Sequence, residues 1–511
     1  MDRLVTSLVK LPASPIALFI FLLILLSVLK FIIGCVGGPN ACSLPKGSPQ
    51  HLVQGHLPLL GSALFFFRKR RDMLISNGNF SFFVGSKHIV NLSSLEGRKT
   101  FFESRSLSIS QGAIELLAGL VSANDDREDY GAQDFIKSLM ALLRPSLLMG
   151  KIPIITSDIR SFDDCLARQA PSQACPQWRV LDPFQTMYSL IFKLIMRVVG
   201  VSEWLQDENL LEHNLSAFCK FEENCSRVRI VFPWFITLTH VKKLFYGAIL
   251  YSSITKVVNE RKKGGKRQDD AIQYLLDEDK DVVRFLFSTL SSGITTEGCS
   301  AAWLTVFLAH SPTWQAKCRA EVDGVIAKIR KSQNQSAHDI LGSLSLQEWE
   351  LEFPVIVAAF RETVRLAMPG AMFRKNASGS AISIGDTGEV IPDGSYASFL
   401  MDNVHMDSKL YPEPSKFDPG RYLLENGGLN DQEHQPHTYV GWGSGRHLCP
   451  GMRLAKLEIT MVMAHLLVNF QLEPSDEKGL KLRGPFPLVD RNGYRMTKSK
   501  TPIYVRYKAL K

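Results

Sequence analysis

The stretch from Asp281 to His310 constrains the fold of this chain more than any other segment. Its thirty residues contain no proline, and their apolar members recur at helical spacing. At about 1.5 Å per residue, such a helix is about 45 Å long, which is enough to cross a whole domain. We therefore expect a helix that runs through the core of one large folded body.

The same stretch carries a polar patch in its interior, from Ser291 to Glu297. A glycine inside a helix costs about 1 kcal/mol of stability relative to alanine, and hydroxyl side chains are also poorer helix formers. Breaks in local consistency of this kind occur mainly at functional sites. The patch therefore predicts a functional site along this helix.

The remaining patterning predicts a protein that is mainly α with small β-sheets. Two β-rich runs between Phe80 and Leu92 flank a short turn, and short β-rich runs alternate with glycine and proline over 380–400. Apolar residues at helical spacing predict further helices at 131–149, 183–200, 240–262, 312–331, 346–367 and 449–470.

The amino-terminal segment predicts a membrane anchor. Pro15 to Val36 contains about twenty apolar residues, which is enough to span a bilayer once. The apolar run is longer than that of a cleaved signal peptide and leads into Gly37, Gly38 and Pro39, so we expect an uncleaved transmembrane helix. The predicted parts are an anchor at 1–36, a Pro/Gly-rich hinge at 37–50 and a folded body at 51–511.

The basic residues are spread too thinly to predict a nucleic-acid partner. Lys and Arg number 59 against 50 Asp and Glu, and the only short clusters are Arg68–Arg71 and 261–267. Nucleic-acid-binding proteins usually carry a denser basic stripe on a recognisable module. A basic face toward anionic lipid or an acidic partner protein fits better, and solvated surface charge is the alternative for each cluster.

Nine cysteines form no CxxC pair, so neither a disulfide framework nor a cysteine-based zinc site is predicted. Cys449 is distinctive because it follows a glycine-rich loop, GWGSGRHLCPG from Gly441 to Gly451, and precedes a helical segment. Glycines let the backbone approach a flat cofactor, and Pro450 suits the first turn of a helix. Exposed amides at a helix start favour a thiolate, the ligand through which sulfur can assist oxygen–oxygen bond cleavage at haem iron. A buried structural cysteine is the alternative.

This loop resembles the haem-binding signature of the cytochrome P450 family. Trp442, Gly445 and Gly451 stand seven and four positions before and two positions after Cys449, where the signature has an aromatic residue and two glycines. Trp442 replaces the usual phenylalanine, and His447 stands where an arginine commonly binds a haem propionate. An indole can still shield the sulfur, and an imidazole can still donate a hydrogen bond. The loop is most similar to those of fungal members.

Three other motifs follow the order of the same family. Glu362 and Arg365 resemble its ExxR pair, since residues three apart share a helical face and can form a bidentate ion pair. Arg421, within FDPGRY, matches the arginine that completes this triad. The resemblance implies that the triad supports the cysteine loop. Arg374 stands where the family places a second propionate-binding residue.

The polar patch also matches the family's central helix, which opens at a glycine and places a threonine three residues later beside bound dioxygen. Gly293 and Thr296 fill these positions. An acid that relays protons often precedes the threonine, whereas this chain has Thr295, and its nearest carboxylate, Glu297, points about 100° away around the helix. The alternative for Thr296 is a hydroxyl bonded to its own backbone.

The resemblance implies the cytochrome P450 fold and a haem-thiolate monooxygenase, with haem b bound through Cys449 and Thr296 in proton relay. Its electrons would come from NADPH through NADPH–cytochrome P450 reductase, with cytochrome b5 as an optional second donor. The expected substrate is a hydrophobic small molecule of fungal secondary metabolism, such as a terpenoid, polyketide or alkaloid. The expected location is the endoplasmic reticulum membrane, with one span in the lipid and the catalytic domain in the cytosol.

Two other enzymatic hypotheses and one non-enzymatic hypothesis remain open at this point. A haem-thiolate isomerase or dehydratase that acts on a peroxide would need no external oxygen, and the missing acid at Thr295 motivates it. A sterol or fatty-acid hydroxylase would use the same site on another substrate. A haem-sensing or scaffolding membrane protein would have no need for the polar patch.

Overall fold

The computed structural model covers most of the folded body. It describes residues 78–84, 87–109, 111–112, 128–199, 201–225, 236–264, 267–268, 270–430, 435–491 and 496–510. The predicted anchor and hinge lie outside these residues. Within them, no single helix has the length and apolarity to cross a membrane, although Phe135–Leu142 and Pro145–Arg168 together meet these criteria across a bend of 65°.

The predicted fold class, mainly α with small β-sheets, is confirmed. The helices in chain order are α5 (Leu95–Glu103), α7 (Glu128–Leu142), α8 (Pro145–Arg168), α9 (Pro183–Val199), α10 (Ser202–Leu205), α11 (Glu208–Glu223), α13 (Leu238–Lys262), α14 (Ala271–Asp277), α15 (Val282–Thr289), α16 (Thr295–His310), α17 (Pro312–Ile329), α18 (Ala337–Gly342), α19 (Leu346–Leu351), α20 (Pro354–Ala367), α21 (Asp402–His405) and α22 (Met452–Asn469).

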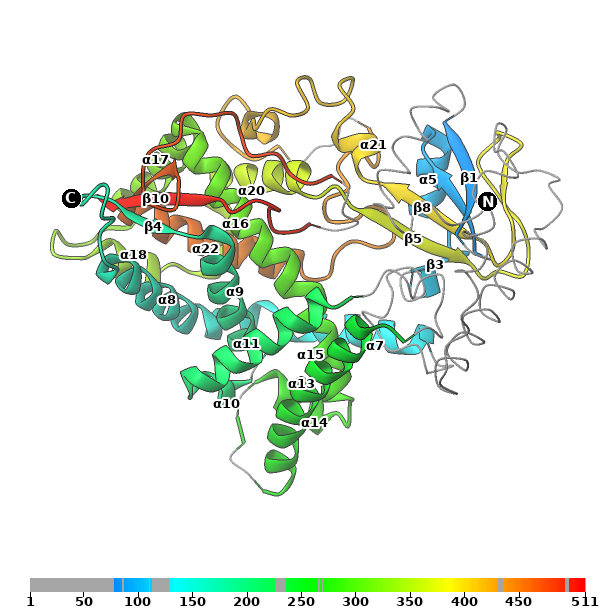
Figure 1. Cartoon of the computed structure of the whole chain (residues 1–511), viewed down its shortest axis with the longest axis horizontal. Helices are drawn as coiled ribbons and strands as arrows, with labels where there is room; N and C mark the ends of the chain where they lie inside the picture. Colours follow the sequence, from blue (N-terminus) through cyan, green and yellow to red (C-terminus); the bar gives the residue numbers. More distant parts are fainter. Residues whose placement is uncertain are drawn as a thin grey trace, which may run out of the picture.

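The strands form three small sheets at two ends of the molecule (Figure 1). The largest has the order β1-β2-β8-β5-β3 and includes the predicted hairpin near Phe80. The others are β4-β10-β9 and β6-β7. The strands are β1 (Asn79–Val84), β2 (Lys87–Leu92), β3 (Leu107–Ser108), β4 (Arg179–Leu181), β5 (Ala371–Asn376), β6 (Ile382–Ser383), β7 (Val390–Ile391), β8 (Tyr396–Leu400), β9 (Phe470–Ser475) and β10 (Tyr504–Ala509).

The predicted long helix runs through the middle of the helical layer (Figure 1). It is continuous from Val282 to His310, but a π-helical turn at Leu290–Ile294 separates α15 from α16. This turn contains Gly293 and the first half of the polar patch. Single π-helical turns inside α-helices are frequent at functional sites. The prediction of a core helix is confirmed, since α16 is buried along nearly its whole length.

Two of the predicted helices were wrong in their continuity. The helix predicted at 131–149 is broken ahead of Pro145, where Arg144 is extended with φ −61° and ψ 144°. The helix predicted at 346–367 is likewise broken ahead of Pro354. In both places proline disfavours the helical conformation of the residue before it, and this local effect outweighs the apolar periodicity.

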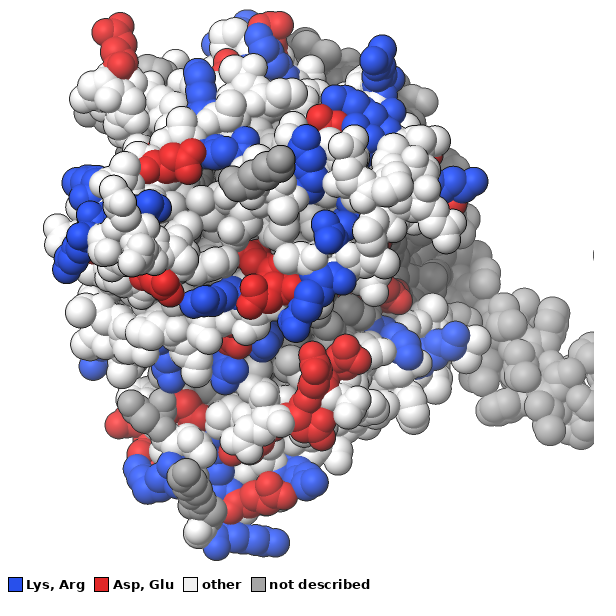
Figure 2. Space-filling model, turned by 90° about the vertical axis from the view of Figure 1, so that its left-hand side faces the viewer, with Lys and Arg blue, Asp and Glu red and all other residues white. Residues whose placement is uncertain are grey.

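Charge on the surface is mixed in sign. On the face shown in Figure 2, Lys and Arg side chains are interspersed with Asp and Glu. The basic cluster at 261–267 is not one exposed patch. Arg261 is buried and bonded to Glu203 and Asp270, while Arg267 pairs with Asp277 at the surface. The interpretation of this cluster as a basic docking face was therefore wrong for Arg261.

Candidate active site

The Cys449 loop is held in place by its own backbone. The amide of Cys449 donates to the carbonyl oxygen of Trp442 at 2.8 Å, and that of Gly443 donates to Val440 at 3.0 Å. Gly443 and Gly445 have φ of +74° and +60°. A Cβ on Gly443 would collide with the backbone oxygen of His447, and one on Gly445 would lie 2.7 Å from a backbone oxygen of α5. The close packing of the loop therefore requires glycine at these two positions.

The tip of this loop is accessible. Every residue from Gly445 to Cys449 is exposed, whereas Ser444 before them and Leu454 just after them are buried. The thiol of Cys449 accepts hydrogen bonds from the backbone amides of Gly451 and Met452, at the start of α22. The loop thus leaves its sulfur accessible to a ligand, while the glycines keep the loop in this conformation.

The ionisation of Cys449 differs from the sequence expectation. The thiol is accessible but partly desolvated by the surrounding protein, and this desolvation raises the pKa of Cys449. The two amide hydrogen bonds lower that pKa, as expected at a helix start, but burial and the charge of Glu297 outweigh them. The free cysteine is therefore held as a thiol. A bound metal cation would be needed to stabilise the thiolate, because metal binding displaces the thiol proton.

The buried guanidinium of Arg374 fits an anionic ligand. It extends from β5, is 3% exposed, and donates to the backbone oxygen of Phe101, whose ring lies 4.5 Å from its central carbon. Among the described residues no carboxylate pairs with it. Burial lowers the pKa of Arg374 to about 10, so it stays a cation at neutral pH. Its charge also lowers the pKa of His447, after the larger effect of burial, which places the two side chains near each other.

Glu362, Arg365 and Arg421 are brought together beneath the loop. Nε and Nη2 of Arg365 donate to the two carboxylate oxygens of Glu362 at 2.7 and 2.8 Å, and both side chains are fully buried. Nε of Arg421 reaches the same carboxylate at 3.4 Å. Buried ion pairs gain most when the remaining donors are also satisfied, and Arg365 meets this condition by donating to the carbonyl oxygens of His405 and Pro414.

Trp442, at the foot of the loop, packs edge to face against Phe360 of α20 with ring centroids 5.5 Å apart. This contact ties the loop to the helix that also carries Glu362 and Arg365. The indole is partly buried in the main core. Trp442 therefore contributes to the position of the loop through packing.

Thr296 differs from its neighbours on the central helix in two ways. Every other residue of α16 except the terminal His310 is buried, whereas Thr296 is partly exposed. Thr289, Ser300 and Thr305 each bond the carbonyl oxygen four residues earlier. The hydroxyl of Thr296 makes no such bond within the described part of the chain. A hydroxyl bonded to its own backbone is therefore not the arrangement observed.

The sequence did not reveal the carboxylate that bonds to Thr295, which is that of Glu222. Oγ1 of Thr295 donates to the carboxylate of Glu222, and the hydroxyl of Tyr188 lies 3.1 Å from the same Oγ1. These three residues line a cavity of about 160 Å³, together with Lys498. Glu222 belongs to α11, more than seventy residues earlier, so spacing along the central helix could not reveal it.

The nearest acid along the chain, Glu297, is turned elsewhere. It is buried and interacts electrostatically with the buried Glu458 of α22. Burial raises the pKa of Glu297 to about 7, and burial together with the charge of Glu297 raises that of Glu458. Two carboxyl groups in contact cannot both be ionised cheaply, so the pair retains a proton. Because the charge of Glu297 also acts on Cys449, this pair places the polar patch beside the thiol.

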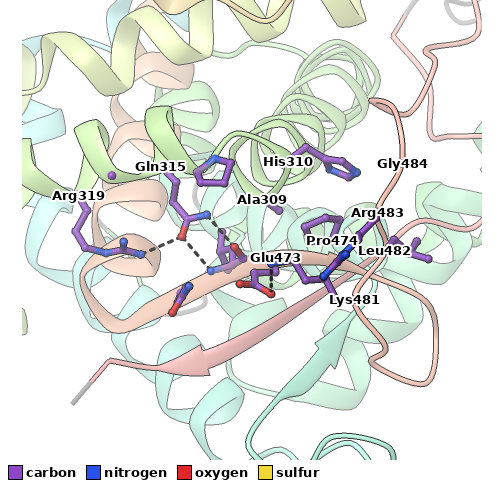
Figure 3. A pocket seen from close by; sticks show the side chains of 14 residues that line it. Ala309, His310, Gln315, Arg319, Glu473, Pro474, Lys481, Leu482, Arg483 and Gly484 are labelled. Atoms are coloured by element: carbon purple, nitrogen blue, oxygen red, sulfur yellow. Dashed lines mark hydrogen bonds and ion pairs between the residues drawn. The ribbon is translucent and has the colours of Figure 1, made fainter.

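A larger pocket, of about 410 Å³, lies between the end of α16, the start of α17 and β9 (Figure 3). None of its lining residues belongs to the Cys449 loop. The amide of Gln315 donates to the backbone oxygens of Leu308 and Leu472, and Arg319 donates to Gln315. These polar side chains are bonded to one another and to the backbone of the pocket walls. We therefore assign the catalytic chemistry to the Cys449 loop.

Comparison with known proteins agrees with this geometry. Residues 45–493 match the family model described as Cytochrome P450. The chain belongs to the cytochrome P450 family. The cytochrome P450 monooxygenase AacuE of Aspergillus aculeatus is 29% identical over 451 residues, which cover 85% of this chain and 88% of the relative. The cytochrome P450 monooxygenase dmxR5 of a Cryptosporiopsis species is 29% identical over 486 residues, with 91% and 90% covered. The corresponding nsrP of Aspergillus novofumigatus is 27% identical over 483 residues, with 90% and 89% covered.

Membership of the cytochrome P450 family implies a haem iron, and the residues described above fit one. Cys449 offers an accessible sulfur ligand at the start of α22. Arg374 and His447 offer donors for two carboxylates, and Gly443 and Gly445 leave the loop without side chains where it must pack tightly. Thr296 lies next to Glu297 in the polar patch of α16. The charge of Glu297 acts on the thiol of Cys449, so the patch lies near that thiol.

Proposed function

We propose that this cytochrome P450 is a monooxygenase that oxidises a hydrophobic small molecule in a fungal secondary-metabolite pathway. The observation that carries the proposal is the combination of the accessible Cys449 at the start of α22 with Thr296, the one interior residue of α16 that is not buried and a neighbour of Glu297, whose charge acts on the thiol. The relatives named as monooxygenases support it, because they match this chain over most of its length.

The haem, when bound, supplies the chemistry of oxygen activation. The residues of the chain provide its surroundings. Cys449 would hold the haem as the thiolate donor, Arg374 would neutralise one carboxylate of the cofactor, and the neutral His447 would donate a hydrogen bond to another. Trp442 packs against Phe360, and its carbonyl oxygen accepts the amide of Cys449, so it fixes the position of the loop. Thr296 holds a proton at its hydroxyl for transfer to the reacting oxygen.

The proton that reaches Thr296 would come from the cavity beside Thr295. Glu222 supplies a carboxylate at the position where the central helix has none. It accepts a hydrogen bond from Thr295, which belongs to the polar patch, and the hydroxyl of Tyr188 also bonds to Thr295. This arrangement removes the motive for an enzyme that rearranges a peroxide, since a carboxylate is present at the position where the sequence shows none.

Electrons would come from NADPH through NADPH–cytochrome P450 reductase, with cytochrome b5 as an optional second donor. We place the protein at the endoplasmic reticulum membrane, with residues 1–36 as its single span in the lipid and the catalytic domain in the cytosol. The apolar run from Pro15 to Val36 supports this location. Deletion of residues 1–36 is expected to release the protein from the membrane fraction.

The reduced carbon-monoxide difference spectrum of the wild type and of Cys449→Ala tests the haem ligand. The wild type is expected to show the red-shifted Soret band of thiolate-ligated haem, and the variant is expected to lose it. The reaction is tested by supplying oxygen, NADPH and the reductase together. Product formation from a peroxide without NADPH would overturn the monooxygenase proposal, and metabolite profiles after disruption of the coding gene would identify the substrate.

A further inference from the structure

Three side chains with metal-binding atoms meet where α8, α18 and α22 pack together, at the left of the molecule in Figure 1. Asp163 comes from α8, His338 from α18 and His465 from α22. One ligand atom from each lies within 4.8 Å of the others. α22 begins at Met452, just after Cys449, and His465 lies thirteen residues farther along it, which is about 20 Å at 1.5 Å per residue. This cluster is therefore separate from the candidate haem site.

The distances within the cluster are close to those of a tetrahedral zinc site. Nδ1 of His338 lies 2.9 Å from Nδ1 of His465, and that atom lies 3.8 Å from Oδ2 of Asp163. Zinc bonds of about 2.0–2.2 Å at tetrahedral angles separate neighbouring ligand atoms by about 3.3 Å. The third pair, Asp163 and His338, has ligand atoms within 4.8 Å of each other, so side-chain rotations would have to close this distance for all three atoms to reach the spacing of a zinc site.

The cluster has a carboxylate but no cation bonded to it. Asp163 is 3% exposed, and its Oδ1 has no hydrogen-bond partner among the described residues. The nearest basic side chain that affects the histidines electrostatically is Arg160, which pairs at the surface with Asp339. Asp164 adds a second negative charge close to Asp163. A buried carboxylate in such surroundings is costly unless a cation compensates it.

The surroundings also position the ligands. The side-chain amide of Asn469 donates to Oδ2 of Asp163 at 2.9 Å and lies 3.1 Å from Nε2 of His338. The ring of His465 stacks on Trp349, with centroids 6.4 Å apart. The side chain of His338 is 16% exposed, so the cluster reaches solvent at this residue. Hydrogen bonds to ligand side chains of this kind are typical around metal sites.

We propose that Asp163, His338 and His465 bind one zinc ion, with water as the fourth ligand, and that this ion joins α8, α18 and α22. Two nitrogens and one oxygen in a tetrahedral arrangement suit Zn²⁺, whereas Ca²⁺ and Mg²⁺ prefer six or more oxygen ligands. The role is structural. The three helices lie in different parts of the sequence, and the ion stabilises the folded chain by binding to it alone.

The test measures zinc on the purified full-length holoenzyme after chelation, reloading with zinc chloride and desalting. The wild type is expected to retain one zinc per chain, and zinc is expected to raise its melting temperature. His338→Gln and Asp163→Asn are expected to retain less than about a tenth as much zinc and to lose the thermal shift, since each removes one of three ligands. Exposed His213 on α11 provides a matched control, His213→Gln, which is expected to behave as the wild type.

Iron content and the carbon-monoxide spectrum of each variant report separately whether the protein has folded and bound haem. X-ray absorption at the zinc edge is expected to show about four nitrogen or oxygen neighbours near 2.0 Å. Wild type that retains no zinc, or His338→Gln that retains as much as the wild type, would overturn the proposal. Because zinc and iron are counted independently, the failure of this site would leave the proposed oxidation unaffected.

Discussion

Nε2 of His405 accepts the backbone N–H of Val440 at 3.0 Å, while the carbonyl oxygen of the same histidine accepts Nη1 of Arg365 at 2.6 Å. Val440 in turn accepts the backbone N–H of Gly443, within the Cys449 loop. His405 thus links the buried ion pair of α20 to the loop that carries the thiol. Burial and the nearby arginine charges hold the pKa of His405 well below its usual value, so the ring is neutral and Nε2 is free to accept.

Replacement of His405 by phenylalanine is expected to lower both stability and haem content. The change keeps a ring of similar shape but leaves the amide of Val440 buried without an acceptor, which costs about 1–3 kcal/mol. Urea unfolding and the ratio of haem to protein would measure the two effects. His213→Phe, at an exposed position, is the control. An unchanged haem ratio in His405→Phe would show that the link does not position the loop.

Arg365→Lys is expected to destabilise the fold severely although it keeps the charge. Lysine cannot bond both oxygens of Glu362 and the carbonyl oxygens that Arg365 also reaches, and breaking a buried pair costs about 3–5 kcal/mol. The pair Glu413–Lys416 has the same spacing but is exposed, so Glu413→Gln is expected to cost less than about 1 kcal/mol. Circular dichroism during thermal unfolding would compare them. Equal losses in the two variants would contradict this account.

Stability is expected to fall as the pH rises from about 4.5 to about 7. Burial raises the pKa of Glu297 to about 7 from its usual 4.5, so in this window the folded state holds a proton that the unfolded state has lost. The lost stability is on the order of 1–3 kcal/mol. Glu297→Gln is expected to flatten this dependence in unfolding measured at pH 5 and pH 8, whereas exposed Glu477→Gln should retain it. A steeper slope in Glu297→Gln would reverse the sign and refute the interpretation.

Thr296→Ala is expected to reduce product formation on the order of 10²-fold, because a positioned proton donor is lost. NADPH consumption should persist and lead to hydrogen peroxide instead, so the ratio of peroxide to product is the measurement. Thr305→Ala on the same helix removes a hydroxyl that only bonds the backbone of Ala301. That control should leave the ratio unchanged, and a similar rise in both variants would assign Thr296 a structural role.

Glu222→Gln is expected to produce the same uncoupling as Thr296→Ala, with a change in the pH profile of kcat. The amide keeps the contact with Thr295 but cannot exchange a proton. Glu223 stands next to it on α11, lines the same cavity and is exposed, so Glu223→Gln is the matched control. If Glu222→Gln keeps the wild-type profile and coupling, protons reach Thr296 by another path.

Much of the fold and the site follows from local sequence. The glycine-rich loop, Cys449 and the helix after it are contiguous, so their chemistry and order can be read directly, and the ExxR spacing places Glu362 and Arg365 on one helical face. The length and apolarity of 281–310 likewise predict a core helix, which the structure contains. These features depend on neighbours within a few turns of the chain.

The tertiary structure decided everything that depends on distant partners. It supplied Glu222 from α11 to a helix that lacks an acid of its own at Thr295, and it turned Glu297 toward Glu458. It also placed Arg261 in buried ion pairs, although the sequence of the basic cluster at 261–267 predicts surface charge. The sequence by itself determined which residue types stand near one another along the chain. Folding decided which of them lose water and which charges they face, and these two factors set their pKa values and their roles.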